Sequence, residues 1–155
     1  MCIRDSHTRA VLDRHGSVDF WKVAMRPGRP FAFGTLEDGA LLFGLPGNPV
    51  AALVTFYALA RDAILLAAGA SPEPRLRLQA RSREAIRKRP GRTEFQRAVV
   101  SLGTDGVWSV GTTGTQGAGV LRSMSEANAL LVLRHEQGSV AAGEPVEVWP
   151  FDGLV

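Results

Sequence analysis

The sequence predicts an α/β layer followed by an all-β region, and two observations carry this prediction. Up to residue 70 the apolar segments follow the order strand, loop, strand and helix, which is typical of an α/β layer with parallel strands. Beyond a proline-containing linker at residues 70–74, apolar and polar residues alternate with a period of two, which indicates strands. We therefore expect two units, residues 7–70 and 71–155, the second of them a small β-barrel.

Two strands are expected in the first unit. Residues 20–25 are apolar and β-favouring, and they end at residues 26–30, which read Arg-Pro-Gly-Arg-Pro. Proline and glycine prevent a central strand from continuing there, so this segment is predicted to be a rigid, cationic loop. Residues 40–45 are apolar on both faces, as in a strand that is covered on each side by helices.

Capping residues in the sequence indicate where the helix of the first unit begins and ends. Asn48 is a favourable N-cap, Pro49 fits the first helical position and Gly69 marks the end, so we expect a helix over residues 49–68. Because it is apolar almost all round, this helix is expected to be buried on both sides. The charges at residues 61–62 argue against a membrane span, since each costs about 2.5–3.5 kcal/mol at the bilayer centre.

Strand, glycine turn and helix start together suggest an anion site. The turn at residues 46–49 leaves backbone N–H groups free at the positive end of the helix dipole. Lys22, Arg26 and Arg29 lie close enough along the chain to converge on the same place. The sequence therefore predicts a pocket for a phosphate-like or other tetrahedral oxyanion. The alternative, an ordinary turn flanked by solvated basic residues, stays open at this point.

The second unit reads as a series of short strands. Residues 76–80, 95–100, 107–110, 130–133 and 146–151 carry the strand pattern, and Asp105-Gly106 is a hairpin signal. Basic residues gather at its start, with nine Lys or Arg against three Asp or Glu in residues 71–100, although the net charge of the chain is only +3.

Composition narrows the classes of function. A hydrophobic content of 45% is that of a soluble globular protein. The single cysteine, Cys2, excludes a disulfide framework and a cysteine-based metal site, and it fits a reducing, cytoplasmic setting. The first residues lack the apolar segment of a signal peptide. His7, His15 and His135 do not have the spacing of metal ligands, so no metal site is expected from the residues of this chain.

Several segments resemble the molybdopterin molybdenumtransferase family, of the MoeA and gephyrin E-domain type. The matching residues are Trp21-Lys22, Arg26-Pro27-Gly28-Arg29-Pro30, Phe33-Gly34, Gly44-Leu45-Pro46-Gly47-Asn48-Pro49-Val50-Ala51, Gly91-Arg92-Thr93-Glu94-Phe95-Gln96-Arg97, Thr112-Thr113-Gly114-Thr115-Gln116-Gly117-Ala118 and Ala127-Asn128-Ala129-Leu130. The resemblance runs from about His7 to the C-terminus. It implies the C-terminal part of a three-layer, molybdopterin-binding-like α/β domain, followed by the small β-barrel domain of the family.

The resemblance also implies an activity. Members insert molybdate into adenylylated molybdopterin and release AMP, with a divalent metal that is normally Mg²⁺. The family's upstream loop, G-G-x-S-x-G-[DE], which holds the metal-binding acid, has no match in this sequence. We therefore expect the chain to be part of a longer, cytoplasmic homodimer that handles small anionic substrates, without a membrane or nucleic acid. Residues 1–6 do not match the family and are expected to be a non-native start.

The resemblance implies catalytic and substrate-binding roles for specific residues. Lys22 is expected to serve the substrate phosphate and, with Arg26, to act in catalysis. Arg26 and Arg29 correspond to basic residues associated with molybdate. The other expected substrate-binding residues are Pro30, Pro46, Gly47, Asn48, Pro49, Arg97, Thr113 and Gln116, with Arg97 reaching the pocket from the barrel. Ala51 and Ala118 stand where the family often has serine, so two hydroxyl contacts are lost.

Two functions of other classes compete with the enzyme. Gephyrin-type relatives use this region as a scaffold for dimerisation and for binding receptor peptides, without catalysis. A basic barrel could also bind nucleic acid through residues 75–97. Against this reading, that stretch contains a single aromatic residue, Phe95, and therefore lacks a platform on which bases stack.

We expect the chain of residues 1–155 alone to form no molybdenum cofactor. The physical reason is that the metal-binding acid of the upstream loop has no counterpart in the sequence. The measurement is cofactor formation from adenylylated molybdopterin, molybdate and Mg²⁺ by the purified chain. Steady turnover would contradict this expectation.

Overall fold

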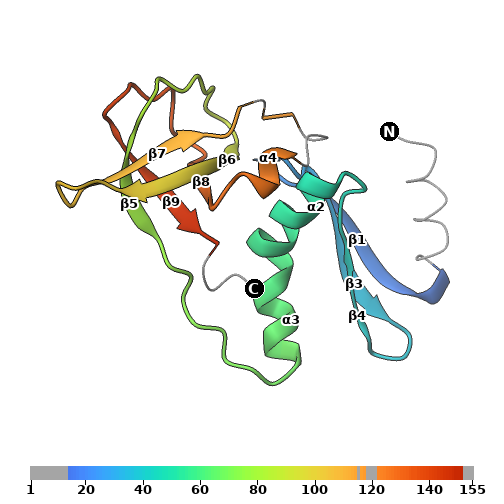
Figure 1. Ribbon diagram of the computed structural model, residues 1–155. Helices are drawn as coiled ribbons and strands as arrows, with labels where there is room; N and C mark the ends of the chain where they lie inside the picture. The colour runs from blue at the N-terminus through green and yellow to red at the C-terminus, as the bar shows by residue number, and fades with distance from the viewer. Residues whose placement is uncertain (1–13, 115, 118–121, 152–155) are drawn as a thin grey trace.

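The computed structural model describes residues 14–114, 116–117 and 122–151 (Figure 1). Residues 1–6, expected to be a non-native start, and Ala118 lie outside the described residues. The first part of the chain contains β1 (Gly16–Lys22), β2 (Met25–Arg26), β3 (Pro30–Leu36), β4 (Leu41–Gly44), α2 (Pro49–Thr55), η1 (Phe56–Ala60) and α3 (Arg61–Ala67). The second part contains β5 (Leu78–Ser82), β6 (Thr93–Leu102), β7 (Trp108–Thr112), α4 (Arg122–Ser125), β8 (Ala129–Leu133) and β9 (Pro145–Pro150).

The predicted fold class, α/β followed by all-β, is confirmed. Figure 1 shows the helical segment α2–α3 between a three-stranded sheet and a barrel. The strand pairing within the first sheet differs from the expectation, because β1, β3 and β4 are antiparallel and not parallel. The reason is β3, which the sequence reading did not identify. It is joined to β1 by residues 23–29 and to β4 by the turn at Gly39, and such short connections join antiparallel strands only.

The predicted helix is present, and its ends are those that the sequence indicates. The Asn48 side chain accepts a hydrogen bond from the backbone N–H of Ala51 (3.4 Å), and Pro49 is the first helical residue. Gly69, with φ +79°, donates to the Leu66 carbonyl, while Ala70 donates to the Leu65 carbonyl, which is the pattern of a Schellman cap.

The middle of the helix departs from the expectation. Residues Phe56–Ala60 form a π-helical turn between α2 and α3. The Tyr57 carbonyl in this turn accepts a hydrogen bond from Arg75, whose guanidinium also lies 4.4 Å from the ring centre of Trp149. Arg75 therefore links the helix to the barrel. Burial lowers the pKa of Arg75, and the nearby Asp62 carboxylate, 3.6 Å away, opposes that shift.

In the single chain α2 is buried on one face, whereas Leu53 on another face is 38% exposed. Val50, Val54 and Thr55 of α2 are fully buried, whereas α3 has no buried residue, and Leu66 is 61% exposed. The expected burial on both sides is therefore not found in the single chain, either for α2 or for α3. By length and composition alone, the segment Pro49–Ala67 could cross a membrane. The core helices of soluble proteins pass the same test, so this is weak evidence.

The barrel confirms the strands expected from the alternating pattern. Strands β6, β7, β5, β9 and β8 form a ring that closes through pairing of β6 with β8. The Asp105-Gly106 hairpin is also confirmed, with Gly106 at φ +77° between the antiparallel β6 and β7. Inward-facing aliphatic residues fill the ring, namely Ala80, Ile86, Ala98, Val100, Val110, Ala129, Leu131, Leu133, Val140, Val146 and Val148.

A second apolar cluster joins the two parts of the chain. Met25 of β2 and Val54 of α2 pack with residues on the outer side of the barrel, which are Phe95, Leu130, Val132 and Trp149. Strand β8 is therefore buried on both faces, with Leu131 and Leu133 inside the ring and Leu130 and Val132 under the helix. Beside this cluster, β2 pairs in parallel with the start of β6.

We expect Asn128→Ala to destabilise the barrel by about 1–3 kcal/mol. The Asn128 side chain accepts from the backbone N–H of Val100 (2.8 Å) and donates to the Val100 carbonyl (2.9 Å), so alanine leaves both groups without these partners. Urea unfolding would measure the loss. Asn128→Asp keeps the acceptor but sets a carboxylate oxygen against the Val100 carbonyl, so it should destabilise the barrel at least as much as alanine. Stability within about 0.5 kcal/mol of the natural chain for Asn128→Ala would contradict this role.

Candidate oxyanion site

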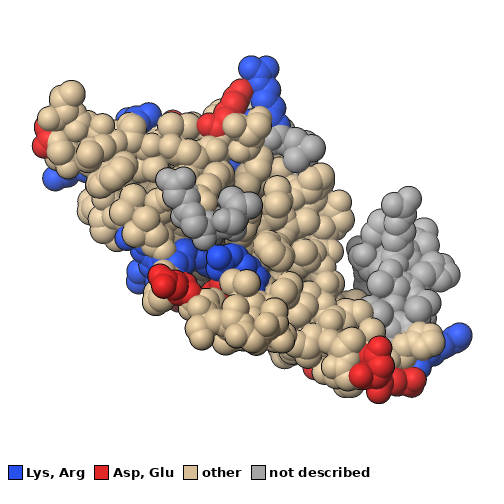
Figure 2. Space-filling model, turned by 60° about the horizontal axis from the view of Figure 1, so that its bottom comes forward, with Lys and Arg blue, Asp and Glu red and all other residues tan. Residues whose placement is uncertain are grey.

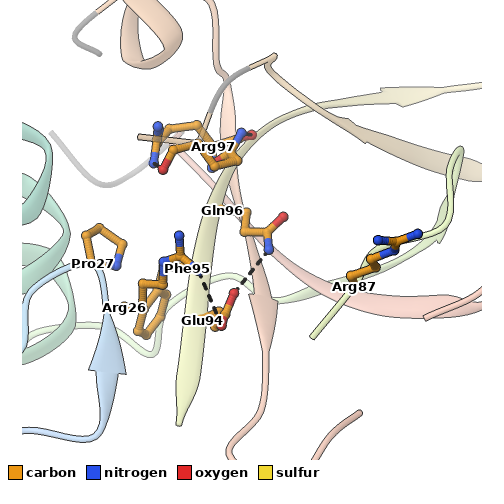
Figure 3. A pocket seen from close by; sticks show the side chains of 8 residues that line it. Arg26, Pro27, Arg87, Glu94, Phe95, Gln96 and Arg97 are labelled. Atoms are coloured by element: carbon orange, nitrogen blue, oxygen red, sulfur yellow. Dashed lines mark hydrogen bonds and ion pairs between the residues drawn. The ribbon is translucent and has the colours of Figure 1, made fainter. Parts of the chain in front are cut away.

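A cavity of about 80 Å³ opens where β2 meets the start of β6 (Figure 3). Its lining residues are Arg26, Pro27, Arg87, Glu94, Phe95, Gln96, Arg97 and Gln116. Pockets for drug-sized ligands are several times larger, whereas this volume accommodates a small ion with a little water. Three arginines and one glutamate give the lining a net charge of +2. The site is therefore suited in size and charge to a small anion.

Arg26 reaches the cavity because β2 is paired with β6. The register sets Met25 opposite Thr93 and Arg26 opposite Glu94, and the backbone N–H of Thr93 donates to the Ala24 carbonyl (2.9 Å). The Arg26 Nη1 lies 4.0 Å from the Glu94 carboxylate, and its side chain is 57% exposed. Arg26 is thus held at the cavity by its backbone, while its guanidinium stays accessible.

The loop that follows Arg26 is pressed against helix α2. Gly28 is buried and has φ +99°, a conformation that favours glycine. A Cβ at this position would lie 2.2 Å from the Thr55 hydroxyl oxygen and 3.5 Å from the Ala51 carbonyl. The Thr55 hydroxyl is fully buried and has no hydrogen-bond partner among the described residues. Glycine is therefore required for the loop to approach the helix this closely.

Arg97 enters the cavity from the barrel and is 1% exposed. Its Nε donates to the Ser123 hydroxyl (3.0 Å), and its two terminal nitrogens donate to the carbonyls of Gln116 (3.3 Å) and Gly117 (3.0 Å). Burial lowers the pKa of Arg97, and the positive charge of Arg26 adds to the effect. Two guanidinium groups from distant parts of the sequence are therefore close enough to repel each other.

Gln116 and Thr113 hold the backbone of Arg97. The Gln116 amide accepts from the Arg97 N–H (2.8 Å) and donates to the Arg97 carbonyl (3.0 Å), as a neighbouring strand would. The Thr113 hydroxyl bonds to the carbonyls of Arg97 (3.2 Å) and Ser123 (2.9 Å). Both residues therefore act on the arginine that lines the cavity.

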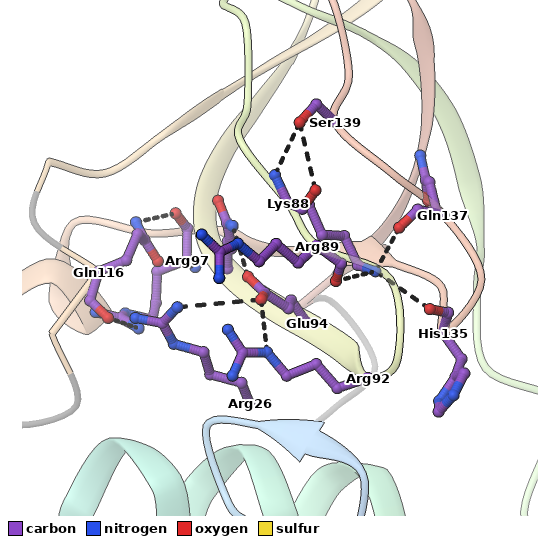
Figure 4. A network of polar contacts seen from close by, with 11 residues as sticks. Arg26, Lys88, Arg89, Arg92, Glu94, Arg97, Gln116, His135, Gln137 and Ser139 are labelled. Carbon is purple, nitrogen blue, oxygen red and sulfur yellow. Dashed lines mark hydrogen bonds and ion pairs between the residues drawn. The ribbon is translucent and has the colours of Figure 1, made fainter.

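Glu94 is a carboxylate inside this cationic site (Figure 4). It is 4% exposed, accepts a hydrogen bond from Arg92 Nε (2.9 Å) and one from the Gln96 amide (3.3 Å), and faces Arg26 at 4.0 Å. Nearby, the Lys88 ammonium donates to backbone carbonyls, the nearest being that of Gln137 at 2.6 Å. Lys88 is thereby occupied with the barrel turn and not with the cavity.

The structure brings together some of the predicted site residues and separates others. Arg26, Arg97 and Gln116 line the cavity, and Thr113 supports it. Lys22 lies at the end of β1, Pro30 starts β3, and Asn48 caps α2 within the predicted turn of Pro46, Gly47, Asn48 and Pro49. These residues, together with the exposed Arg29, are not part of the cavity lining.

Sequence reasoning missed several lining residues. Pro27, Glu94, Phe95 and Gln96 lie within the quoted segments but received no role, and Arg87 lies outside those segments. A signal for Glu94 exists, because it is the one acid among the arginines of residues 87–97. In the parts of the chain that the structure describes, no group of three His, Cys, Asp or Glu side chains is placed to hold a metal ion.

Comparisons with known proteins agree with this fold. Residues 4–66 match the family described as "Probable molybdopterin binding domain", and residues 79–151 match "MoeA C-terminal region (domain IV)". The molybdopterin molybdenumtransferase of Haemophilus influenzae is 41% identical over 96% of this chain, and the gephyrin of Dictyostelium discoideum is 29% identical over 90%. The moeA protein structure from Pyrococcus horikoshii superimposes with a TM-score of 0.73 at 26% identity, covering 93% of this chain.

The fold and the sequence motifs together define a molybdopterin-binding type of domain followed by a MoeA-type barrel. The chain belongs to the molybdopterin molybdenumtransferase family. It spans between about a fifth and somewhat more than a third of the length of its relatives, with 37% of the Haemophilus protein, 22% of the Dictyostelium protein and 34% of the Pyrococcus chain covered.

We expect Gly28→Ala to destabilise the chain by at least about 1 kcal/mol more than Gly39→Ala. Both glycines have positive φ, which costs a non-glycine residue about 1–2 kcal/mol, but only Gly28 faces another atom at 2.2 Å. Nothing lies within 4 Å of the corresponding position at Gly39, so this variant is the matched control. Urea unfolding of both variants measures the difference. Equal losses would show that the contact with Thr55 is not tight.

Proposed function

We propose that the cavity between β2 and β6 binds molybdate, and that the protein takes part in the insertion of molybdate into adenylylated molybdopterin with release of AMP. In this proposal it is a transferase of molybdenum cofactor biosynthesis. The relatives support it, since the Haemophilus protein at 41% identity is a molybdopterin molybdenumtransferase. Residues 7–70 and 71–155 are its two proposed domains.

The main support for the proposal is that Arg26 and Arg97 line the same cavity. They come from the first and second parts of the chain and line one small cavity. Guanidinium groups bind tetrahedral oxyanions through charge-assisted hydrogen bonds, which are stronger than neutral ones. Molybdate carries two negative charges, and the lining carries a net charge of +2. An oxyanion therefore relieves the repulsion between the two arginines, which burial alone cannot do.

The proposed roles follow from where each residue lies. Arg97, fixed by Gln116 and Thr113, is the rigid donor to molybdate, and Arg26 is the accessible one. Lys22, Arg29 and Pro30, and the turn of Pro46, Gly47, Asn48 and Pro49, lie beside the cavity loop in the chain but outside the lining. We assign them to the larger substrate, with Lys22 at its phosphate and, together with Arg26, in catalysis.

Three further parts of the proposal rest on the family resemblance. Mg²⁺ would assist hydrolysis of the adenylate, but the described residues provide no ligand set for it. A homodimer is supported by apolar side chains exposed along the helix, namely Leu53, Leu59, Ile64 and Leu66. A cytoplasmic protein that works without a membrane completes the proposal.

Nucleic acid is not a proposed partner. Figure 2 shows basic side chains in small groups, most of them with acidic side chains beside them, and not as one continuous basic surface. Within residues 75–97, Arg75 and Arg92 each pair with a carboxylate, and Arg83 donates to two serine hydroxyls. The aromatic residue of that stretch, Phe95, is 6% exposed. Bases would therefore find no stacking surface there, and part of the positive charge is already paired with carboxylates.

A scaffold role is the second candidate. The Dictyostelium relative is a gephyrin, and the exposed apolar residues of the helix suit a protein contact as well as a dimer. A measurement of molybdate binding distinguishes the transferase from the scaffold. The transferase requires molybdate in the cavity, whereas the scaffold does not.

We expect the purified chain to bind molybdate and Arg26→Gln to weaken this binding about tenfold, because one charged donor is lost. Isothermal titration calorimetry at fixed ionic strength measures both. Arg81→Gln is the matched control, since Arg81 is exposed on β5 and donates to the Gly143 carbonyl away from the cavity lining. Absence of binding by the natural chain, or an equal loss in Arg81→Gln, would overturn the oxyanion site and favour the scaffold.

A further inference from the structure

The carboxylate of Glu94 is unexpected in a site for an anion. It lines the cavity, it is 4% exposed, and it lies opposite Arg26 in the pairing of β2 with β6. An acid in this place repels every anion that enters. Its presence therefore calls for an explanation in terms of what the site does with its ligand.

We propose that Arg26 exchanges its partner Glu94 for molybdate when the ligand binds. The charge of Glu94, which stays beside the cavity, then sets an upper limit to the affinity of the site for oxyanions. This inference rests on the proposed binding of molybdate. In the empty site Glu94 neutralises part of the charge of Arg26 and Arg92. When molybdate binds, Arg26 turns to the ligand, while Glu94 remains as a nearby negative charge.

The distances to the Glu94 carboxylate distinguish Arg26, which turns to the ligand, from Arg92, which stays with Glu94. Arg92 Nε lies 2.9 Å from the Glu94 carboxylate in a direct hydrogen bond, whereas Arg26 Nη1 is 4.0 Å away and makes only a loose ion pair. Arg26 also has the more exposed side chain, 57% against 44% for Arg92. Since the backbone of Arg26 is fixed by β2, only its guanidinium has to move.

Arg92 and Gln96 keep Glu94 in its place during the exchange. They bond to different oxygens of the carboxylate, Arg92 to Oε1 and Gln96 to Oε2. Both belong to the same segment as Glu94, so these contacts do not depend on the loop that carries Arg26. The negative charge therefore stays beside the cavity whether or not a ligand is present.

A limit on affinity is useful because the bound molybdate must leave the site when it is transferred to molybdopterin. Binding energy that is equal for the bound reactant and the transition state does not accelerate a reaction, and it slows the departure of the ligand. A cavity with three arginines and no acid would hold a dianion tightly. Glu94 lowers this affinity without removing the donors that orient the oxyanion.

The test uses two tetrahedral oxyanions of different charge, molybdate (−2) and perrhenate (−1). The electrostatic energy is proportional to the charge of the ligand, so removal of the Glu94 charge should act twice as strongly on molybdate in free energy. We expect Glu94→Gln to tighten perrhenate binding about fivefold and molybdate binding about 25-fold, the square of that factor. Calorimetric titration of the full chain at pH 8 measures both constants.

Two variants control the measurement. Glu37→Gln removes an acid of the exposed β3–β4 turn, outside the cavity lining, and should leave both constants unchanged. Glu94→Asp keeps the charge beside the cavity, so neither anion should bind tighter by the factor expected for Glu94→Gln, even where stability falls. Thermal unfolding of each variant shows whether it is folded at the temperature of titration.

The outcomes separate this inference from the proposed function. Suppose that the natural chain binds molybdate and that Glu94→Gln binds each anion no more tightly than the natural chain does. Glu94 then only supports the arginines, so the inference is wrong, while the oxyanion site stands. If neither protein binds molybdate, the proposed function fails and the inference with it. Binding by Glu94→Gln alone would show that the natural chain does not bind molybdate, which overturns the proposed function and this inference with it. If Glu94→Gln is unfolded, a tightening of molybdate binding in Glu94→Asp as large as that expected for loss of the charge would overturn the inference, because the charge is still present.

Discussion

The candidate site depends on the parallel pairing of β2 with the first residues of β6. Two residues on each strand are involved, Met25 with Thr93 and Arg26 with Glu94, and so short a ladder contributes little stability by itself. Its position is secured on the other side by Met25, which packs with Phe95, Val54 and their apolar neighbours. Hydrophobic burial thus fixes the backbone, and the alternation of side chains along the strand turns the next residue, Arg26, towards the cavity.

The parts of the fold that the sequence predicted are those with a local cause. Asn48, Pro49 and Gly69 mark the helix because capping involves residues only a few positions apart. The barrel strands were predictable since one face of each meets a closed apolar core, which imposes alternation. Even the continuous apolar run Ala129–Leu133 has a simple explanation, because the barrel covers one face and helix α2 with its neighbours covers the other.

The parts that the sequence did not predict depend on pairing across long separations. Strand β3 was hidden by Pro30, which reads as a break but is tolerated as the first residue of a strand. Nothing near β2 indicates that it joins the barrel, because its partner lies in the other half of the chain. For the same reason Arg26, Arg97 and Gln116 could be proposed individually, whereas Glu94 became meaningful only when Arg26 was found opposite it.

The two arginines of the cavity are held in different ways, and this difference suits the transfer of an anion. Arg97 is buried and donates to Ser123, Gln116 and Gly117, so its direction is set before a ligand arrives and costs no reorganisation on binding. Arg26 is exposed and has one long ion pair, so it can follow the ligand. A fixed donor gives orientation, and a mobile donor allows release. A site built from two fixed arginines would orient the oxyanion equally well but would let it go more slowly, since no donor could leave it for another partner.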